Sequence, residues 1–162
     1  MNWEAISAIG QIVGAFAVVI SLIYLAREIR SNARASRVAS METIIQWLRQ
    51  LAERPDLREL YYRGVHDFDS LKGADLIGFG VLMNQLFHIF SEMYYQRLEG
   101  HLEPRVWREV EAPFRDLIAY PGIQAWSRLR SHWFSDEFGK FVDQVQQTAG
   151  PPTMYREPMK DE

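Results

Sequence analysis

The feature that most constrains this chain is an uncharged, mostly apolar run of 22 residues near its N-terminus, AISAIGQIVGAFAVVISLIYLA over residues 5–26. About 20 such residues in a helix are enough to cross the hydrocarbon core of a bilayer. Trp3 and Tyr24 lie near the two ends of the run, where aromatic side chains are enriched in membrane helices. The run predicts a transmembrane anchor over residues 1–26.

Two other kinds of apolar segment have to be compared with this one. A cleaved signal peptide carries positive charge before its apolar run and a small-residue cleavage site after it. Here Glu4 precedes the run and the sequence YLAREIR ends it. A core helix of this length is rarely apolar around its whole circumference. Both comparisons favour the anchor.

The charges that follow the run predict its orientation. Residues 27–37 carry four arginines and one glutamate, a local charge of +3, and the arginines are Arg27, Arg30, Arg34 and Arg37. Positive charge beside a membrane helix marks the cytoplasmic side. We therefore expect a single-pass protein of the plasma membrane, with its N-terminus outside and its C-terminal domain in the cytoplasm. The arginines share one helix face, so they are candidates for contact with lipid headgroups. The simpler interpretation is that they set the topology and extend their charged ends to the membrane surface.

One face of the predicted anchor carries small side chains. Gly10, Gly14, Ala17 and Ser21 lie within about 60° of one another on a helix, and Gln11 flanks them. Small residues let two helices approach closely in lipid. These five residues predict a helix–helix interface, made with a second copy of the chain or with another membrane protein. The alternative is that Gly and Ala are simply common in membrane helices.

The remainder of the chain is expected to be helical. No Pro or Gly occurs over residues 27–53, which predicts a juxtamembrane helix continuous with the anchor. A 3,4 spacing predicts that one side of it packs on a neighbour, within the chain or between chains; this side carries Val38, Met41, Ile45, Leu48 and Ala52.

A helical domain is predicted over residues 54–149, followed by a loose polar tail over residues 150–162. Helices are expected over about 56–62, 74–99, 104–119, a segment around Trp126 that ends near 133, and 136–148, and residues 64–73 are expected to form a loop. Pro113 is expected to kink or interrupt its helix, and Ser135 is expected to cap the last one. No segment alternates with period two. The fold class is all-α: one N-terminal transmembrane helix that continues into a cytoplasmic helical bundle.

Composition excludes several kinds of chemistry. The chain has no Cys, which excludes disulfides, thiolate metal sites and Cys nucleophiles. From residue 40 onward there are 14 basic and 19 acidic residues, and this balance is unsuited to nucleic-acid binding. No phosphate-binding glycine loop or nucleophile elbow occurs. We therefore predict no cofactor and no catalytic residues.

A polar stripe on the helix over residues 74–99 is the best candidate for a site of another kind. It carries Gln85, His88, Glu92, Tyr95 and Glu99 at spacings of three and four residues. His88 and Glu92 form an i, i+4 pair of a type that can hold a metal, although the Glu-x-x-His motifs of di-metal bundles are missing. The other interpretation is a helix face hydrogen-bonded within the domain, with an Arg of the next helix as a possible partner.

Several segments together resemble a widespread group of small, uncharacterised bacterial membrane proteins. They are LIYLAREIRSNARASR after the apolar run, then EMYYQRLEGHLEPRVW, PGIQAW and FSDEFGKFVDQV in the C-terminal domain. The resemblance implies a bacterial origin and an anchored helical domain, and it assigns no catalytic or binding residue. The expected function is a non-enzymatic accessory or interaction protein, with a ligand or metal sensor, or an enzyme, built on His88, Glu92 and Tyr95 as the alternative.

Overall fold

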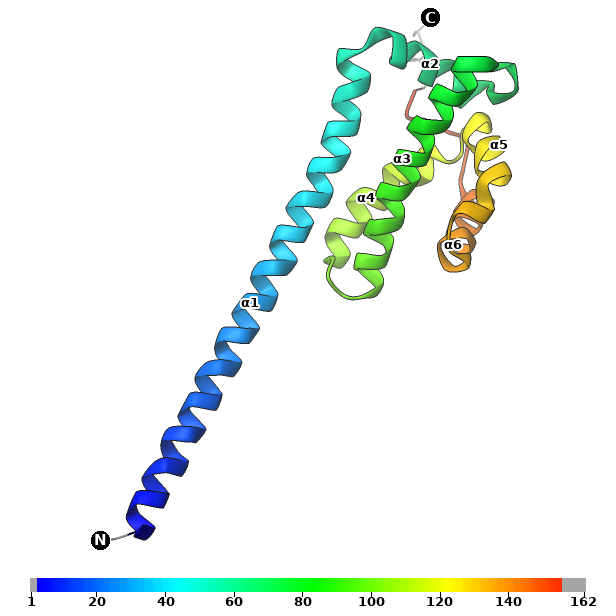
Figure 1. The fold of residues 1–162 in the computed structure, drawn as a ribbon. Coiled ribbons are helices and arrows are strands. Elements are labelled where there is room, and N and C mark those ends of the chain that lie inside the picture. The colour runs from blue at the N-terminus through cyan, green and yellow to red at the C-terminus, as the bar shows by residue number, and fades with distance from the viewer. Residues whose placement is uncertain (1–2, 156–162) are drawn as a thin grey trace, which may run out of the picture. The chain divides into compact units, whose positions relative to one another are not determined.

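The structure is a computed structural model that describes the backbone of residues 3–155 and the side chains in that range, except those of residues 4–10, 12–13, 26 and 29–40. Its regular structure within residues 3–155 is entirely helical (Figure 1). The helices are α1 (Trp3–Glu53), α2 (Pro55–His66), α3 (Gly73–Leu98), α4 (Pro104–Leu117), α5 (Pro121–Arg130) and α6 (Asp136–Thr148), with short 3-10 turns η1 (Phe68–Ser70) and η2 (Ser131–Trp133). The predicted all-α fold is confirmed.

The chain divides into two compact units between Ala39 and Ser40. The sequence suggested a domain that begins at residue 54, but the second unit already includes the last turns of α1. Trp47 and Leu51 explain the difference, because both are buried in the core of this unit. A large aromatic side chain buried at this position makes residues 40–53 part of the domain rather than a separate connecting helix.

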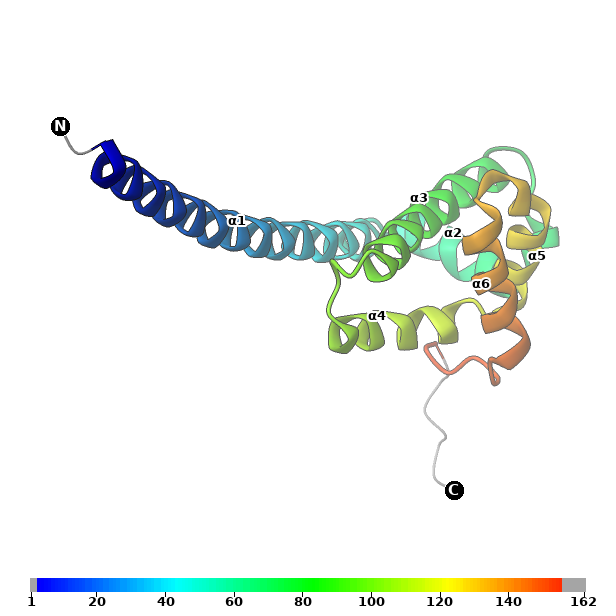
Figure 2. The same ribbon diagram turned by 90° about the horizontal axis from the view of Figure 1, so that it is seen from below.

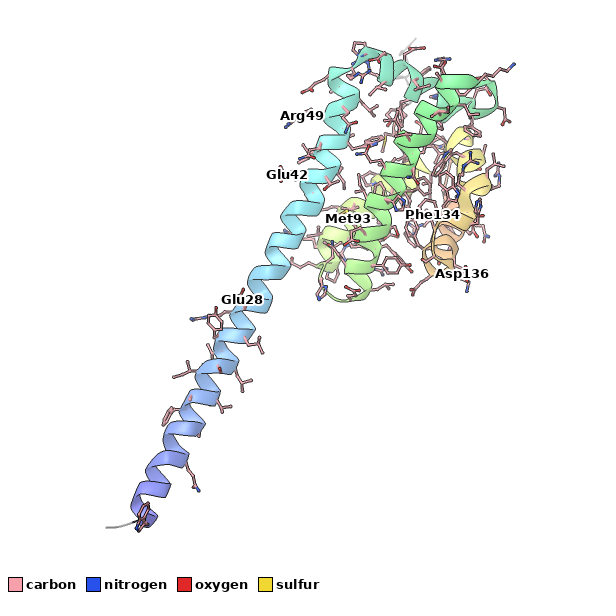
Figure 3. All side chains as sticks on the ribbon, viewed as in Figure 1. Glu28, Glu42, Arg49, Met93, Phe134 and Asp136 are labelled. Atoms are coloured by element: carbon pink, nitrogen blue, oxygen red, sulfur yellow. The ribbon has the colours of Figure 1, made fainter. Side chains whose placement is uncertain are left out.

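The side of α1 that packs within the second unit differs from the predicted one. Ile45 and Leu48 are 54% and 51% exposed, and Ala52 is exposed as well. The packed positions are Met41, Ile44, Trp47 and Leu51, and the side chain of Val38 lies outside the described residues. The Trp47 indole determines this orientation, because it is buried and its Nε1–H donates to the carbonyl of Leu82 at 3.3 Å. Glu42 and Arg49 point away from the other helices (Figure 3).

Helix α3 is the centre of the second unit. It buries ten residues, among them Phe79, Met83 and Met93, each fully covered. Figures 1 and 2 show α4 lying alongside α3, and Met93 projects among the side chains that fill the bundle (Figure 3). Rings from α3, α4 and α6 stack on one another, with Phe90 and Phe114 at 4.1 Å between ring centroids. Aromatic burial of this kind supplies much of the stability of a small domain.

Helices α2 and α5 approach each other through two glycines. A Cβ atom added to Gly122 would lie 1.8 Å from the backbone oxygen of Gly64. A Cβ added to Gly64 would lie 2.2 Å from the Phe79 ring. Gly122 therefore lets α5 pack directly on the backbone of α2, whereas Gly64 leaves room for the Phe79 ring of α3.

Several predicted boundaries hold and others shift. Helix α6 spans the predicted residues, and the Ser135 hydroxyl accepts from the amide of Phe138, so the predicted cap is confirmed. Gly100, with φ of +75°, ends α3 as expected. Helix α2 extends into the predicted loop as far as His66. Pro113 does not interrupt α4.

Among the described helices, α3 is the one whose length and apolar composition would allow it to cross a membrane. It lies in the middle of the chain, and 39% of its most apolar stretch is buried inside the protein. Because α3 supplies the centre of the core, we interpret it as the core helix of the domain. In α1 the described apolar segment is shorter, Gly14–Leu25, and the rest of the predicted anchor includes side chains outside the described residues.

Candidate binding sites

A pocket of about 400 Å³ opens on the second unit. Its walls come from the last turns of α1, from α3 and α4, from Tyr61 of α2, and from residues 154–155 beyond α6. Trp47, Leu86, Phe90 and Val110 form its buried apolar surface. Its volume lies within the range of small-molecule sites, which are mostly apolar with a few placed polar groups.

One wall of the pocket is the C-terminal strap, which we define as residues 151–155. The Asp116 carboxylate of α4 accepts from the amide of Thr153 at 2.6 Å, from its hydroxyl at 3.1 Å and from the amide of Met154. The amide of Tyr155 donates to the Tyr120 hydroxyl at 2.7 Å. The tail predicted to be loose is therefore held up to Tyr155, and residues 156–162 lie outside the described residues.

Three tyrosines join the strap to the domain. The Tyr61 and Tyr155 hydroxyls are 2.9 Å apart, and the Tyr155 ring packs edge-on against Tyr61 and tilted against Tyr120. Burial raises the pKa of the Tyr61 phenol far above its usual value, and the neighbouring Tyr155 adds to the increase. Burial likewise raises the pKa of Tyr155. Burial therefore favours the protonated form of both phenols, and one hydroxyl donates a hydrogen bond to the other.

The pocket has one polar point on α4. Glu109 is the charged residue among the described residues that line it, and Pro113 lies one turn further along the same wall. Because Pro has no amide N–H, the Glu109 carbonyl lacks its usual helical donor at i+4. Arg105 Nε is 4.0 Å from Glu109 Oε1, and both side chains are mostly exposed, so this pair is weak. Glu109 thus brings a weakly paired carboxylate to the edge of an apolar space.

The predicted stripe around His88 is partly engaged in hydrogen bonds of the domain. The Glu92 carboxylate accepts from the Gln96 side chain at 3.1 Å, not from an Arg of the next helix. The Tyr95 hydroxyl hydrogen-bonds the Ser135 hydroxyl, and the His88 ring packs against Phe134. Among the described residues no group of three His, Cys, Asp or Glu side chains is placed to hold a metal.

The predicted small face of α1 is only partly described. Gln11, Gly14, Ala17 and Ser21 are exposed, and a Cβ added to Gly14 would meet no atom within 4 Å. Gly10 lies outside the described side chains. Of the four arginines, Arg27 is exposed, whereas Arg30, Arg34 and Arg37 lie outside the described side chains. The lipid-headgroup role of these arginines stays a prediction.

Sequence reasoning did not identify the pocket. Its lining comes from segments more than 100 residues apart, from Met41 to Tyr155, and no local pattern links them. One signal was available: Pro113 lies inside a strongly amphipathic helix, next to Glu109 one turn earlier. A proline at this position removes one backbone hydrogen bond from that wall of the helix.

Comparison of the chain with protein-family models, with curated proteins and with solved structures finds no match. The resemblance to small bacterial membrane proteins therefore stays a prediction, and the function has to be argued from the residues and geometry of this chain.

Proposed function

We propose that this chain is a membrane-anchored, non-enzymatic interaction protein that associates through the small face of α1 and displays its helical domain on one side of the membrane. The observation that carries the proposal is the exposure of the segment Gly14–Leu25. Its large apolar side chains are 52–66% exposed, and they are Phe16, Val18, Val19, Ile20, Leu22, Ile23 and Leu25.

Because successive residues turn by about 100°, these side chains cover the helix circumference except for a sector of about 140°, which holds the small residues Gly14, Ala17 and Ser21. Exposing them to water costs about 25 cal/mol for each Å² of apolar surface. A helix that is apolar all round is stable where lipid surrounds it. The open space at Gly14 supports the second part of the proposal, because a close helix neighbour needs a position without a side chain.

Membrane association and self-association are tested separately. The chain has no Cys, so single-cysteine variants can be labelled at one chosen site. In cells treated with a membrane-impermeant maleimide, we expect Trp3→Cys to react from outside and Ser70→Cys to react only after permeabilisation. Extraction of the protein from membranes by alkaline carbonate would contradict the anchor. Reaction of Ser70→Cys in intact cells would contradict the orientation.

Association is measured as the mass of the full-length chain, taken from its membrane in native lipid discs, together with any co-purifying protein. Gly14→Ile should reduce the assembly to a single copy or release its partner, because a β-branched side chain keeps the helices apart. Ala15→Ile is the matched control: Ala15 is exposed and lies about 130° from the centre of the small face. An unchanged assembly in Gly14→Ile and in Gly10→Ile would overturn the interface.

A further inference from the structure

We propose that the pocket between α1, α3, α4 and the C-terminal strap binds a small amphiphilic amine, with its apolar body inside the pocket and its ammonium group at Glu109. The pocket lies wholly within the unit that begins at Ser40. It is therefore independent of the proposed anchor.

The pocket is a mostly apolar hollow that is open to the surface, and its volume of about 400 Å³ is that of a small-molecule site. Large apolar side chains are left in water at its edge: Leu48 is 51% exposed, Met154 40% and Tyr155 37%. An apolar occupant would cover this surface and be stabilised by the same burial.

The rings of the pocket suit an apolar body attached to a cation. Trp47 and Tyr61 meet edge to face at 5.5 Å between ring centroids, and Phe90 lines the α3 wall. Flat apolar surfaces of this kind pack on aliphatic or aromatic groups alike. Their negative ring faces also attract a nearby cation.

The polar point of the pocket accepts hydrogen bonds and carries negative charge. Glu109 is the charged residue among the described residues that line the pocket, and its side chain is 65% exposed. Its carboxylate supplies a charge that favours a cation and repels an anion. A carboxylate also accepts hydrogen bonds, so it fits an ammonium group, which has donors and no acceptor.

The test uses the full-length chain in discs of zwitterionic lipid and three photoreactive ten-carbon probes that differ only in their polar end: a primary amine, an alcohol and a carboxylate. Labelled residues are found by mass spectrometry. Each variant is compared with the unaltered chain for the same probe, so that partitioning of the probes into lipid cancels.

Glu109→Gln should lower amine labelling of the pocket by about threefold, the size expected of an exposed ion pair. It should leave alcohol labelling unchanged and raise carboxylate labelling. Glu53→Gln, an exposed glutamate of α1 that does not line the pocket, is the control and should change none of them. An equal effect of Glu109→Gln on all three probes would overturn the amine assignment.

Leu48→Trp should reduce labelling by every probe, because the larger side chain fills the mouth. Ile45→Trp is matched to it, since Ile45 is equally exposed on the same helix and does not line the pocket. Equal labelling in these two variants, or no pocket labelling in the unaltered chain, would overturn the proposal. A change of oligomer mass in Leu48→Trp alone would assign the pocket to a second copy instead.

Discussion

At the scale of single residues, Gly122 and Gly139 both lie inside helices, but they differ in how much room is left for a side chain. A Cβ at Gly122 would overlap the backbone of α2, whereas a Cβ at Gly139 would meet no atom within 4 Å. Gly122→Ala should therefore destabilise the domain by about 1–3 kcal/mol. Gly139→Ala should stabilise it by about 0.5–1 kcal/mol, because Ala loses less backbone entropy in a helix than Gly.

Thermal unfolding followed by circular dichroism measures both changes against the unaltered chain. The melting temperature should fall for Gly122→Ala and rise for Gly139→Ala. A melting temperature that does not fall for Gly122→Ala would show that α2 and α5 do not meet at Gly122.

The buried phenols predict how stability depends on pH. Because the pKa of Tyr61 is raised above its unfolded value of about 10, its contribution to the free energy of unfolding is complete below pH 10. Above that pH the unfolded chain loses a proton that the folded chain keeps. Stability should then fall with rising pH, by up to about 1.4 kcal/mol per pH unit for this group.

Urea unfolding between pH 8 and pH 11.5 measures this dependence. Tyr61→Phe should make the fall above pH 10 shallower, since the variant has no phenol to keep protonated. Tyr62→Phe, which removes an exposed phenol from the same helix, is the control. Identical pH profiles for Tyr61→Phe and the unaltered chain would mean that Tyr61 is not buried in the folded protein.

At the scale of elements, the C-terminal strap depends on one carboxylate. Asp116 accepts three hydrogen bonds from Thr153 and Met154, and bonds to a charged acceptor are stronger than neutral ones. Asp116→Ala should raise amide hydrogen exchange over residues 153–155 by about tenfold or more, the equivalent of about 1.4 kcal/mol.

Helix α6 provides the reference for that experiment, because exchange over Asp136–Thr148 should stay unchanged in Asp116→Ala. Asp69→Ala, which removes an exposed carboxylate of η1, is the control substitution for Asp116→Ala. Unchanged exchange of the strap amides in Asp116→Ala would show that the hydrogen bonds and ring contacts of Tyr155 hold the strap without Asp116.

The elements that sequence predicted best are those with local signals. The Ser135 cap and the acidic residues after it determine the start of α6, and the positive φ of Gly100 determines the end of α3. The side of α1 that packs within the domain carries Met41, Ile44, Trp47 and Leu51, and of these only Met41 belongs to the predicted set, because two overlapping 3,4 patterns run along the helix. Trp47 belongs to the pattern that was not chosen, and only the position of Leu82, 35 residues away, distinguishes the two.

At the scale of the whole molecule, the division between Ala39 and Ser40 predicts which fragment folds alone. A fragment over residues 40–162 keeps Trp47 and Leu51 and should unfold cooperatively. A fragment over residues 54–162, cut where the sequence suggested, loses both side chains. Removal of a buried Trp costs about 3–5 kcal/mol, a large part of the stability of a domain this size.

Near-ultraviolet circular dichroism and thermal unfolding of the two fragments check this prediction. The longer fragment should show a single sharp transition, and the shorter one a broad transition at lower temperature. Equal melting temperatures would place residues 40–53 outside the folded domain.

The pocket and the strap could not be predicted from sequence for the same physical reason. Asp116 reaches Thr153, and Trp47 and Val110 come to line one pocket, only after the helices have packed. Periodicity reports which side of a helix is buried. It does not report which helix covers that side or where the covering is incomplete.

The two glycines between α2 and α5 differ in what a related chain could replace them with. At Gly64 the obstacle is the Phe79 side chain, so a relative with Ala at this position can compensate with a smaller residue on α3. At Gly122 the obstacle is a backbone oxygen, which every amino acid supplies. Distant descendants of this fold should therefore vary residues 64 and 79 together, and should keep glycine at position 122 for as long as α5 lies against α2.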